Sequence, residues 1–370
     1  MRILLLNYEY PPLGGGGGHV SHQLARELVK MGHKIDVLTI SYKGCKKYEI
    51  VDGVKLYRVP SIRQKMDQGQ VHEMLIYDLS ALVFALRFIK KRNYDLCHAH
   101  FIIPTGVVAL LIKKLTGLPY IITAHGSDVP GHNPIKFSTL HKFFIPLWKT
   151  IIKEAEVVIS PSEHLKEKIL ANYSKCEVRV IPNGFSAENF HPKKKEKIIL
   201  LVGRLLKFKG FQYFLEAIKG MDLKGYKVYI AGDGTYRPYL ENIIKKMEPG
   251  KVKLLGWVKP DHLKKLYEKA SIFVLPSEVE SFGLVLLEAM AARCAVITTD
   301  IDSCKEIVGE AGIVVPRGDI EAIKKAIHKL IKNSEMIELL KEKGIQRVKN
   351  YYDWQEITKR YHTLFSEVIK

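Results

Sequence analysis

The chain has 370 residues, of which 47% are hydrophobic and 26% are charged, and its formal net charge is +19. This length is greater than that of a domain with a single hydrophobic core, so the sequence predicts two globular domains. The composition excludes a disordered or fibrous chain. No apolar run reaches the roughly 20 residues that a membrane-spanning helix needs. The positive charge favours anionic ligands, whether nucleotide diphosphates, anionic lipid surfaces or nucleic acid, and selects none of them.

The five cysteines are scattered and form no C-x-x-C pair, which argues against a disulfide framework and against a zinc site. The segment Met1–Glu9 holds only a short apolar run, which predicts a first strand and not a signal peptide. We therefore expect a cytoplasmic protein whose contact with membranes, if any, is peripheral. The sequence contains no recognition motif of nucleic-acid-binding proteins, so nucleic acid is not an expected partner.

Short β-rich runs alternate with segments of helical periodicity, a pattern that indicates an α/β fold with parallel sheets. In the first half, the predicted strands are Ile3–Asn7, Ile35–Ile40, Leu96–Ala99, Tyr120–Ala124, Val157–Ser160 and Val178–Ile181, and the predicted helices are Val20–Met31, Met74–Lys91 and Gly106–Leu115. In the second half, the predicted strands are Ile198–Val202, Lys227–Ala231, Val252–Leu255, Ile272–Leu275, Ala295–Thr298 and Gly312–Val315. An amphipathic helix is predicted at Trp354–Ile369.

This order of elements predicts two doubly wound, Rossmann-like domains. The first spans 1–185, a polar linker spans 186–197, the second domain spans 198–352, and the C-terminal helix takes up 353–370. Ligands of such sheets bind outside the carboxyl ends of the strands, so the candidate motifs are those that directly follow a strand.

The first motif is the glycine run Gly14–Gly18, between the first strand and the first helix. Backbone N–H groups without neighbouring side chains, at a helix N-terminus, can approach a phosphate closely. The run lacks a complete G-x-G-x-x-G, and no acidic residue ends the second strand, so an NAD site is not expected. A flexible turn without a ligand remains the alternative.

The second motif is Gly203-Arg204 with Lys209-Gly210, after the first strand of the second domain. Arg204 and Lys209 lie five residues apart at a strand-to-helix turn, where both cations can converge on one diphosphate. The Walker pattern G-x-x-x-x-G-K-[ST] is missing, which argues against an ATPase. Two solvated surface cations remain the alternative.

The third motif spans Glu280–Glu288 and contains two carboxylates. A loop carboxylate such as Glu280 can accept hydrogen bonds from sugar hydroxyls, and Glu288, within the following helix, can accept them from a ribose. The N–H groups of Gly283 and Leu284 begin that helix and are suited to a phosphate. Two exposed glutamates that flank a helix remain the alternative.

Together these motifs resemble glycosyltransferase family 4, the retaining group with the GT-B fold, in which two Rossmann-like domains face each other across a cleft. The resemblance extends over almost the whole chain and also implies that the last helix crosses back onto the N-terminal domain. The matching motifs are Tyr10-Pro11-Pro12 with Gly15-Gly16, Asp95–His100, Thr123–Asp128, Pro161-Ser162, Ile181–Gly184, Gly203-Arg204 with Lys209-Gly210, Gly232-Asp233-Gly234, Leu255–Val258 and Glu280–Glu288.

The resemblance implies roles for several of the matching residues. Arg204 and Lys209 would hold the donor diphosphate, Glu280 would contact the hexose, and Glu288 would bind the ribose. His125 would lie near the transferred sugar. The expected catalytic residues are thus His125, Arg204, Lys209 and Glu280, and the expected donor-binding residues are Gly15, Gly16, Gly203, Arg204, Lys209, Gly256, Trp257, Val258, Glu280, Phe282, Gly283, Leu284 and Glu288.

The expected function is the metal-independent transfer of a hexose, with retention, from a UDP-, GDP- or ADP-linked sugar to a hydroxyl of a glycan, a lipid-linked acceptor or a small molecule. No cofactor and no metal site are expected. Asp300-Ile301-Asp302 matches the D-x-D by which other glycosyltransferases bind a metal, but an ordinary loop is expected there. The alternatives are a GT-B sugar-nucleotide epimerase, a phosphorylase, or a non-catalytic sugar-nucleotide-binding protein.

Two places depart from the family pattern. Arg293-Cys294-Ala295 occupy the position of a Gly-x-Pro, so we expect the left-handed helix cap that glycine supplies to be lost. Asp302-Ser303 stand where paired glycines are common, which leaves donor selectivity open.

Two further features concern the first domain. His98 and His100 alternate on a strand and should point to one face, in a packed or hydrogen-bonded role. Lys136–Lys149 mixes aromatics with lysines, which is typical of interfacial helices and of core helices whose lysines reach the surface. With the basic stretch Arg58–Lys65, this segment would attract the protein to anionic membranes.

Overall fold

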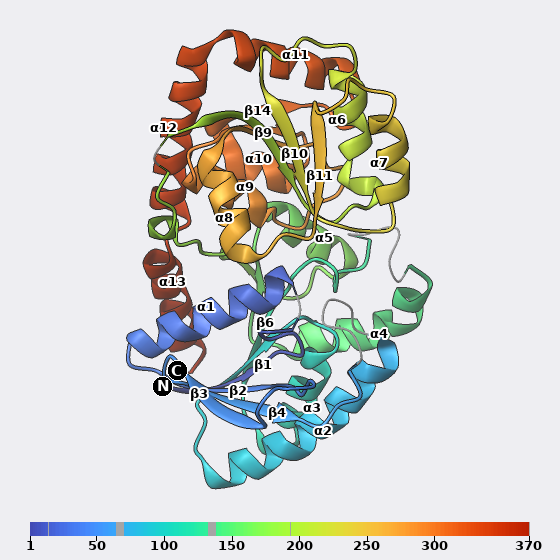
Figure 1. Ribbon diagram of the computed structural model, residues 1–370. Coiled ribbons are helices and arrows are strands. Elements are labelled where there is room, and N and C mark those ends of the chain that lie inside the picture. The colour runs from blue at the N-terminus through green and yellow to red at the C-terminus, as the bar shows by residue number, and fades with distance from the viewer. Residues whose placement is uncertain (14, 64–69, 132–137, 193, 370) are drawn as a thin grey trace. The chain divides into compact units, whose positions relative to one another are not determined.

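The computed structural model describes residues 1–13, 15–63, 70–131, 138–192 and 194–369, and only the backbone of 138–143. The chain divides into two compact units, which Figure 1 shows in the colours of the chain. Unit 1 consists of Met1–Gly184 together with Trp354–Lys370, and unit 2 is Phe185–Asp353. Each unit is an α/β structure built on its own parallel sheet, as predicted.

The sheet of unit 1 has the strand order β3-β4-β2-β1-β5-β6-β7-β8, and its neighbouring strands are parallel except for β3 and β4. The strands are β1 Arg2–Leu6, β2 Lys34–Ile40, β3 Tyr48–Val51, β4 Val54–Val59, β5 Leu96–His100, β6 Tyr120–Thr123, β7 Val158–Ser160 and β8 Val178–Val180. The helices are α1 Gly16–Lys30, α2 Val71–Lys91, α3 Thr105–Thr116, α4 Ser138–Glu154, α5 Glu163–Asn172 and α13 Trp354–Val368. The winding direction reverses between β1 and β5, so the loops that follow these strands flank the switch point of this sheet.

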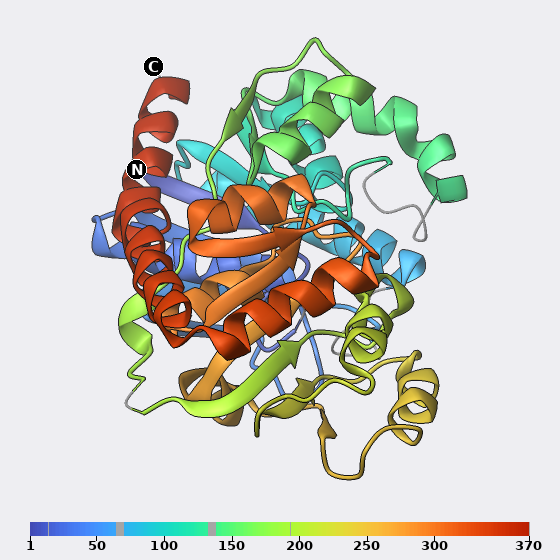
Figure 2. The same ribbon diagram turned by 90° about the horizontal axis from the view of Figure 1, so that it is seen from above.

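Helices cover both faces of this sheet, which is why its central strands are continuous apolar runs and not alternating ones. On one face, Tyr77 of α2 and Val108 of α3 belong to the main hydrophobic core. On the other face, α13 packs along α1 (Figures 1 and 2) and places the rings of Tyr361 and Phe365 against His98. The C-terminal helix thus belongs to the N-terminal unit, as the resemblance implied.

The hairpin of β3 and β4 at the edge of this sheet was not predicted. The two strands pair antiparallel and are joined by Asp52-Gly53, whose φ angles of 51° and 80° are both positive. An Asp-Gly pair between two β-rich runs is one of the strongest local signals for a tight hairpin turn. The signal was therefore present in the sequence.

The sheet of unit 2 is entirely parallel, with the order β11-β10-β9-β12-β13-β14. Its strands are β9 Glu196–Val202, β10 Lys227–Ala231, β11 Val252–Gly256, β12 Ala270–Leu275, β13 Ala295–Thr299 and β14 Gly312–Val315. Its helices are α6 Phe211–Ile218, α7 Arg237–Ile244, α8 Pro260–Lys269, α9 Leu284–Ala291, α10 Asp302–Val308, α11 Ile320–Lys332 and α12 Ser334–Tyr351. Separate hydrophobic clusters fill its two faces. The winding direction reverses between β9 and β12, so the second and third sequence motifs both leave the sheet at this switch point.

The structure removes part of the basis for an anionic membrane contact. Arg58 and Arg63 are buried, and Arg58 forms an ion pair with Glu49 at 2.5 Å. Trp148 is only 2% exposed and donates its indole N–H to the backbone oxygen of Asp128, so this aromatic belongs to the core. Residues 64, 65, 136 and 137 lie outside the described residues. Among the described helices, none has the length and apolarity to cross a bilayer.

A close contact explains the glycine of the Ile181–Gly184 motif. A Cβ atom on Gly184 would lie 2.3 Å from Cδ2 of Trp354, at the start of α13. The last glycine before unit 2 therefore makes room for the first residue of the returning helix.

We expect Gly184→Ala to lower the free energy of unfolding by about 1–3 kcal/mol, because the added methyl group overpacks the indole. Chemical denaturation measures this change. Trp354→Phe removes the benzo ring that the methyl would meet. The double variant should therefore lose less unfolding free energy than the sum of the losses in the two single variants. Strict additivity would contradict the proposed contact.

Candidate functional site

In unit 2, the loops after β9 and β12 are held together by a backbone contact at Gly210. Gly210 has a φ of 70°, and a Cβ on it would lie 1.8 Å from the carbonyl oxygen of Pro276. Glu278 also donates its backbone N–H to the oxygen of Phe208 at 2.8 Å. Any residue other than glycine would separate the two loops, which explains the Lys-Gly sequence of the second motif.

This contact brings Lys209 of the second motif next to Glu280 of the third motif. Nζ of Lys209 lies 2.5 Å from Oε1 of Glu280, and the side chains are only 14% and 10% exposed. Ser277 donates its hydroxyl to the same oxygen at 2.9 Å. Since an ammonium group has three N–H donors, Lys209 can hold Glu280 and still donate to an anion.

Arg204, the other cation of the second motif, lies at the same end of the sheet. Arg204 directly follows Gly203 at the end of β9, and its side chain is exposed. The backbone there packs tightly on the next loop, because a Cβ on Gly232 would lie 1.9 Å from the oxygen of Gly203. The exposed guanidinium is therefore carried by a rigid turn.

The N-terminus of α9 lies next to Glu280 in the chain. Gly283 has a φ of 94° and carries no side-chain cap, so the first N–H groups of the helix, including that of Leu284, are available to an anion. Phe282 is buried and packs against Tyr352, so its ring is part of the hydrophobic core. The sequence had placed Phe282 among the expected donor-binding residues, but its side chain is part of the core.

Glu288 lies one turn into α9. Burial raises the pKa of Glu288 to about 7, so near neutral pH this carboxyl exists in both protonation states. A carboxyl of this kind can accept hydrogen bonds from two neighbouring hydroxyls when ionised, or donate one when protonated.

The end of β11 and the loop after it contain three of the expected donor-binding residues, Gly256, Trp257 and Val258. Gly256 has a φ of 68°, and its carbonyl oxygen accepts the N–H of Gly232 at 2.8 Å. The Trp257 side chain is 71% exposed, and Val258 is half-buried. This loop is thus tied by its backbone to the loop after β10.

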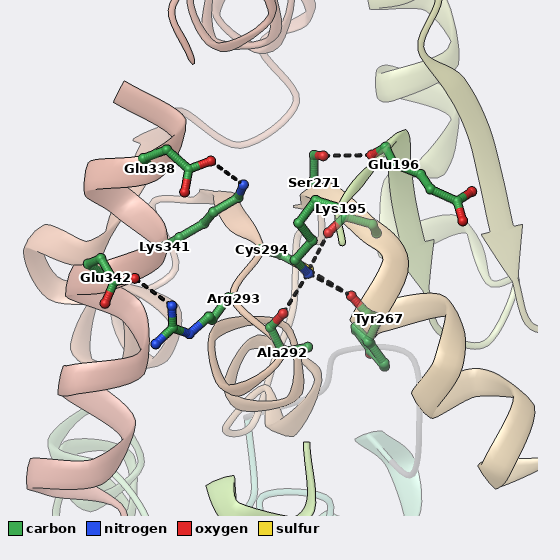
Figure 3. Close-up of polar contacts among 11 residues, drawn as sticks. Lys195, Glu196, Tyr267, Ser271, Ala292, Arg293, Cys294, Glu338, Lys341 and Glu342 are labelled. Carbon is green, nitrogen blue, oxygen red and sulfur yellow. Dashed lines mark hydrogen bonds and ion pairs between the residues drawn. The ribbon is translucent and has the colours of Figure 1, made fainter. Parts of the chain in front are cut away.

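One expectation about this unit was wrong. The left-handed cap at the end of α9 is not lost, because Arg293 itself adopts a φ of 58° and the N–H of Cys294 bonds to the oxygen of Ala289. Figure 3 shows two interactions around this turn: Lys195 donates to the oxygen of Ala292, and Arg293 pairs with Glu342 at 2.6 Å. Arginine takes the place of glycine at the cost of a strained backbone.

The D-x-D segment and the second departure have structural partners of their own. Asp300 pairs with Arg317 at 3.0 Å, and Asp302 pairs with Lys305 at 2.6 Å. Ser303 donates its hydroxyl to the backbone oxygen of Glu280 at 3.0 Å, so it anchors the loop that carries this carboxylate. Within the part of the chain that the structure describes, no three His, Cys, Asp or Glu side chains are grouped to hold a metal ion.

In unit 1, the glycine run packs against His125. A Cβ on Gly17 would lie 3.2 Å from Nδ1 of His125 and 2.7 Å from the ring of Phe101, while Gly15 and Gly16 are exposed at the start of α1. Sequence reasoning selected Gly15 and Gly16 and missed that Gly17 is the glycine against the histidine, because this contact joins residues far apart in the chain.

His125 is held by two polar contacts. Its backbone N–H donates to Asp128 at 2.9 Å, and its Nε2 lies 3.1 Å from Nδ1 of His100, whose ring plane is inclined to its own by only 22°. Burial lowers the pKa of His125 to about 3, so its imidazole is neutral. His98 and His100 do share one face of β5, as predicted, and both are fully buried.

The comparisons with known proteins agree with this geometry. The family described as glycosyl transferases group 1 matches residues 185–347, and the one described as glycosyltransferase family 4 matches residues 14–189. An uncharacterized glycosyltransferase of Methanocaldococcus jannaschii is 30% identical, over 97% of this chain and 96% of its own length. A glycogen synthase of Mycobacterium tuberculosis is 26% identical over 96% of this chain and 92% of its own length.

Solved structures with the same fold include the sucrose-phosphate synthase of Thermosynechococcus elongatus, with a TM-score of 0.84 and 22% identity, over 99% of this chain and 98% of that one. Anabaena HepE in complex with UDP has a TM-score of 0.79 and 16% identity, over 99% of this chain and all of that one. The fold is therefore GT-B. The two family models, together with the relative that is 30% identical over 97% of this chain, identify the chain as a member of glycosyltransferase family 4 and as a glycosyltransferase.

Proposed function

We propose that this glycosyltransferase transfers a hexose, with retention and without a metal ion, from a nucleotide-diphospho-sugar to an acceptor hydroxyl. The observation that carries the proposal is the pair of Lys209 and Glu280 at the switch point of unit 2, next to the N-terminus of α9. A cation and free helix N–H groups suit a diphosphate, and a fixed carboxylate suits sugar hydroxyls.

The chemistry follows from the charge that develops on the donor. As the bond between the anomeric carbon and the phosphate oxygen breaks, negative charge grows on the diphosphate. Lys209, Arg204 and the N–H groups of Gly283 and Leu284 stabilise that charge, and such preorganised groups do the work that a metal ion does elsewhere. The acceptor oxygen attacks the anomeric carbon from the face that the diphosphate leaves, and the proton of the acceptor hydroxyl passes to the leaving phosphate oxygen.

The donor nucleotide is the first quantity to measure. Relatives of the fold have been solved with UDP, as in Anabaena HepE, and with ADP, as in starch synthase IV of Arabidopsis thaliana. UDP-, GDP- and ADP-sugars are therefore the set to compare.

In a thermal-shift series with these sugars, we expect one class of nucleotide to raise the unfolding temperature progressively with concentration, because a ligand of the native state stabilises it. Nucleotide release from that donor should continue in excess chelator. NMR should then find the same anomeric configuration in product and donor. Activity that stops in chelator and returns with magnesium or manganese would contradict the metal-independent mechanism.

The cations can be tested with a matched control in the same turn. Lys209→Ala and Arg204→Ala should each slow transfer by roughly 10²–10³, the loss typical for one group that stabilises transition-state charge. Lys207 lies two residues before Lys209, in the same short helical turn, and is exposed. Lys207→Ala should keep the wild-type rate, and equal rates for all three variants would contradict the assignment.

An apolar cavity in unit 1 supports an acceptor with a hydrocarbon part. It measures about 160 Å³ and lies next to His125, because the loops after β1, β5 and β6 line it together with α2, α3 and α4. Its lining includes Tyr8, Met74, Ile103, Val107, Ser127 and Trp148. Asp78 also lines it, and burial raises the pKa of this carboxyl to about 8, so the protonated, uncharged form predominates at neutral pH.

The surface beside this cavity is apolar as well. Leu75, Leu79 and Val83 are exposed at four-residue spacing along α2, and Leu75 also lines the cavity. Hydrophobic side chains on one exposed helix face favour contact with another apolar group. We therefore include lipid-linked acceptors, bound at the surface of a membrane, in the proposal alongside glycans and small molecules.

Alkyl glycosides of increasing chain length test this part. Each methylene that enters the cavity is worth about 0.8 kcal/mol, or about fourfold in kcat/KM, so an octyl glycoside should be a better acceptor than its methyl analogue. Val107→Phe fills the cavity and should remove the preference, whereas Leu111→Phe, one turn further along α3 and partly exposed, should keep it. Equal use of both glycosides by the wild type would favour a polar acceptor.

A further inference from the structure

A series of contacts between buried polar side chains connects the C-terminal helix α13 to His125. The Tyr361 hydroxyl lies 3.4 Å from Oγ1 of Thr123, and this oxygen lies 2.8 Å from Nε2 of His98. The ring of His98 packs on that of His100 with centroids 4.4 Å apart, and Nδ1 of His100 lies 3.1 Å from Nε2 of His125. The middle members of this series are side chains of β5 and β6, which α13 covers.

Burial keeps these imidazoles neutral. His98 and His100 are fully buried, and this burial lowers the pKa of His98 to about 3 and that of His100 well below its ordinary value. A neutral imidazole carries one N–H and one lone pair. The contact between His100 and His125 therefore has only two arrangements: either Nδ1 of His100 donates, or Nε2 of His125 donates.

The two arrangements differ at the far side of His100. Its Nε2 is buried and has no hydrogen-bonding partner among the described residues. If Nε2 carried the proton, an N–H donor would be buried unpaired, which is rare in folded proteins and costs the desolvation of that donor. If Nδ1 carries the proton, that N–H is satisfied by His125 and only a lone pair remains unpaired.

We propose that His100 is a positioning residue that donates to Nε2 of His125 and so fixes His125 as the tautomer with its proton on Nδ1. This tautomer is the opposite of the one that neutral histidine favours in water. Nδ1 lies on the edge of the ring that packs against Gly17, at the start of α1. His125 consequently presents an N–H donor there, suited to an oxygen of a sugar or of a phosphate, and not a lone pair.

The consequence for catalysis rests on the proposed function, in which His125 lies near the transferred sugar. The tautomer itself does not depend on that function. A spectroscopic measurement on the free protein therefore separates the two: it can succeed or fail whether or not the chain transfers a hexose.

Long-range ¹H–¹⁵N spectra of the histidine-labelled protein report which ring nitrogen carries the proton, and comparison with His125→Gln assigns the signals of His125. We expect a protonated Nδ1 and an unprotonated Nε2 in the wild type. The wild-type spectrum alone can overturn the proposal. It does so if Nε2 of His125 is protonated, or if both tautomers exchange rapidly.

Two substitutions then isolate the hydrogen bond. His100→Phe keeps a ring and removes the donor, so His125 should move toward the Nε2-protonated tautomer. His100→Asn places an amide N–H near the position of Nδ1 and should restore the wild-type signals. His98→Gln is the matched control, because it changes the neighbouring histidine and leaves the contact with His125 in place. An unchanged tautomer in a folded His100→Phe would contradict the assignment.

Activity provides the second readout once the donor is identified. His100→Phe should lower kcat/KM by about two- to tenfold, the range of one neutral hydrogen bond, and His100→Asn should recover most of the loss. Loss in both variants with unchanged tautomers would assign His100 a packing role instead.

Discussion

The candidate site of unit 2 depends on the backbone contact between Gly210 and Pro276. Because no side chain fits between them, the loop after β9 rests directly on the loop after β12, and Lys209 meets Glu280. The cation and the carboxylate hold each other in place while they are partly shielded from water. A preformed pair of this kind needs little reorganisation when a charged ligand arrives, which is the condition for electrostatic stabilisation of a leaving group.

The two units differ in their electrostatics. Unit 2 presents the cations Arg204 and Lys209 and an uncapped helix N-terminus, all suited to phosphate. Unit 1 presents His125, which burial keeps neutral, and a cavity with an apolar lining. Neutral imidazoles do not compete with the cations for the diphosphate, and they suit hydroxyl groups.

Much of the fold follows from local patterns. The predicted parallel strands reappear because continuous apolar runs between helical segments have few other ways to bury both faces, and the predicted helices follow from their periodicity. The β3–β4 hairpin was missed although Asp52-Gly53 is a strong turn signal. The cap at Arg293 was misjudged because a preference for glycine is only statistical, and surrounding contacts can hold arginine in the same conformation.

By itself, the sequence determined the alternation of strands and helices, and with it the strand ends at which functional residues emerge. Spacing along the chain placed Lys209, Glu280 and His125 on such ends, because a parallel sheet gathers its carboxyl ends at one edge. Only the tertiary structure decided which of them touch. The contacts of Gly17 with His125, of His100 with His125 and of Trp354 with Gly184 join residues that are far apart in sequence. Such contacts depend on the packing of side chains between elements, which no local pattern encodes.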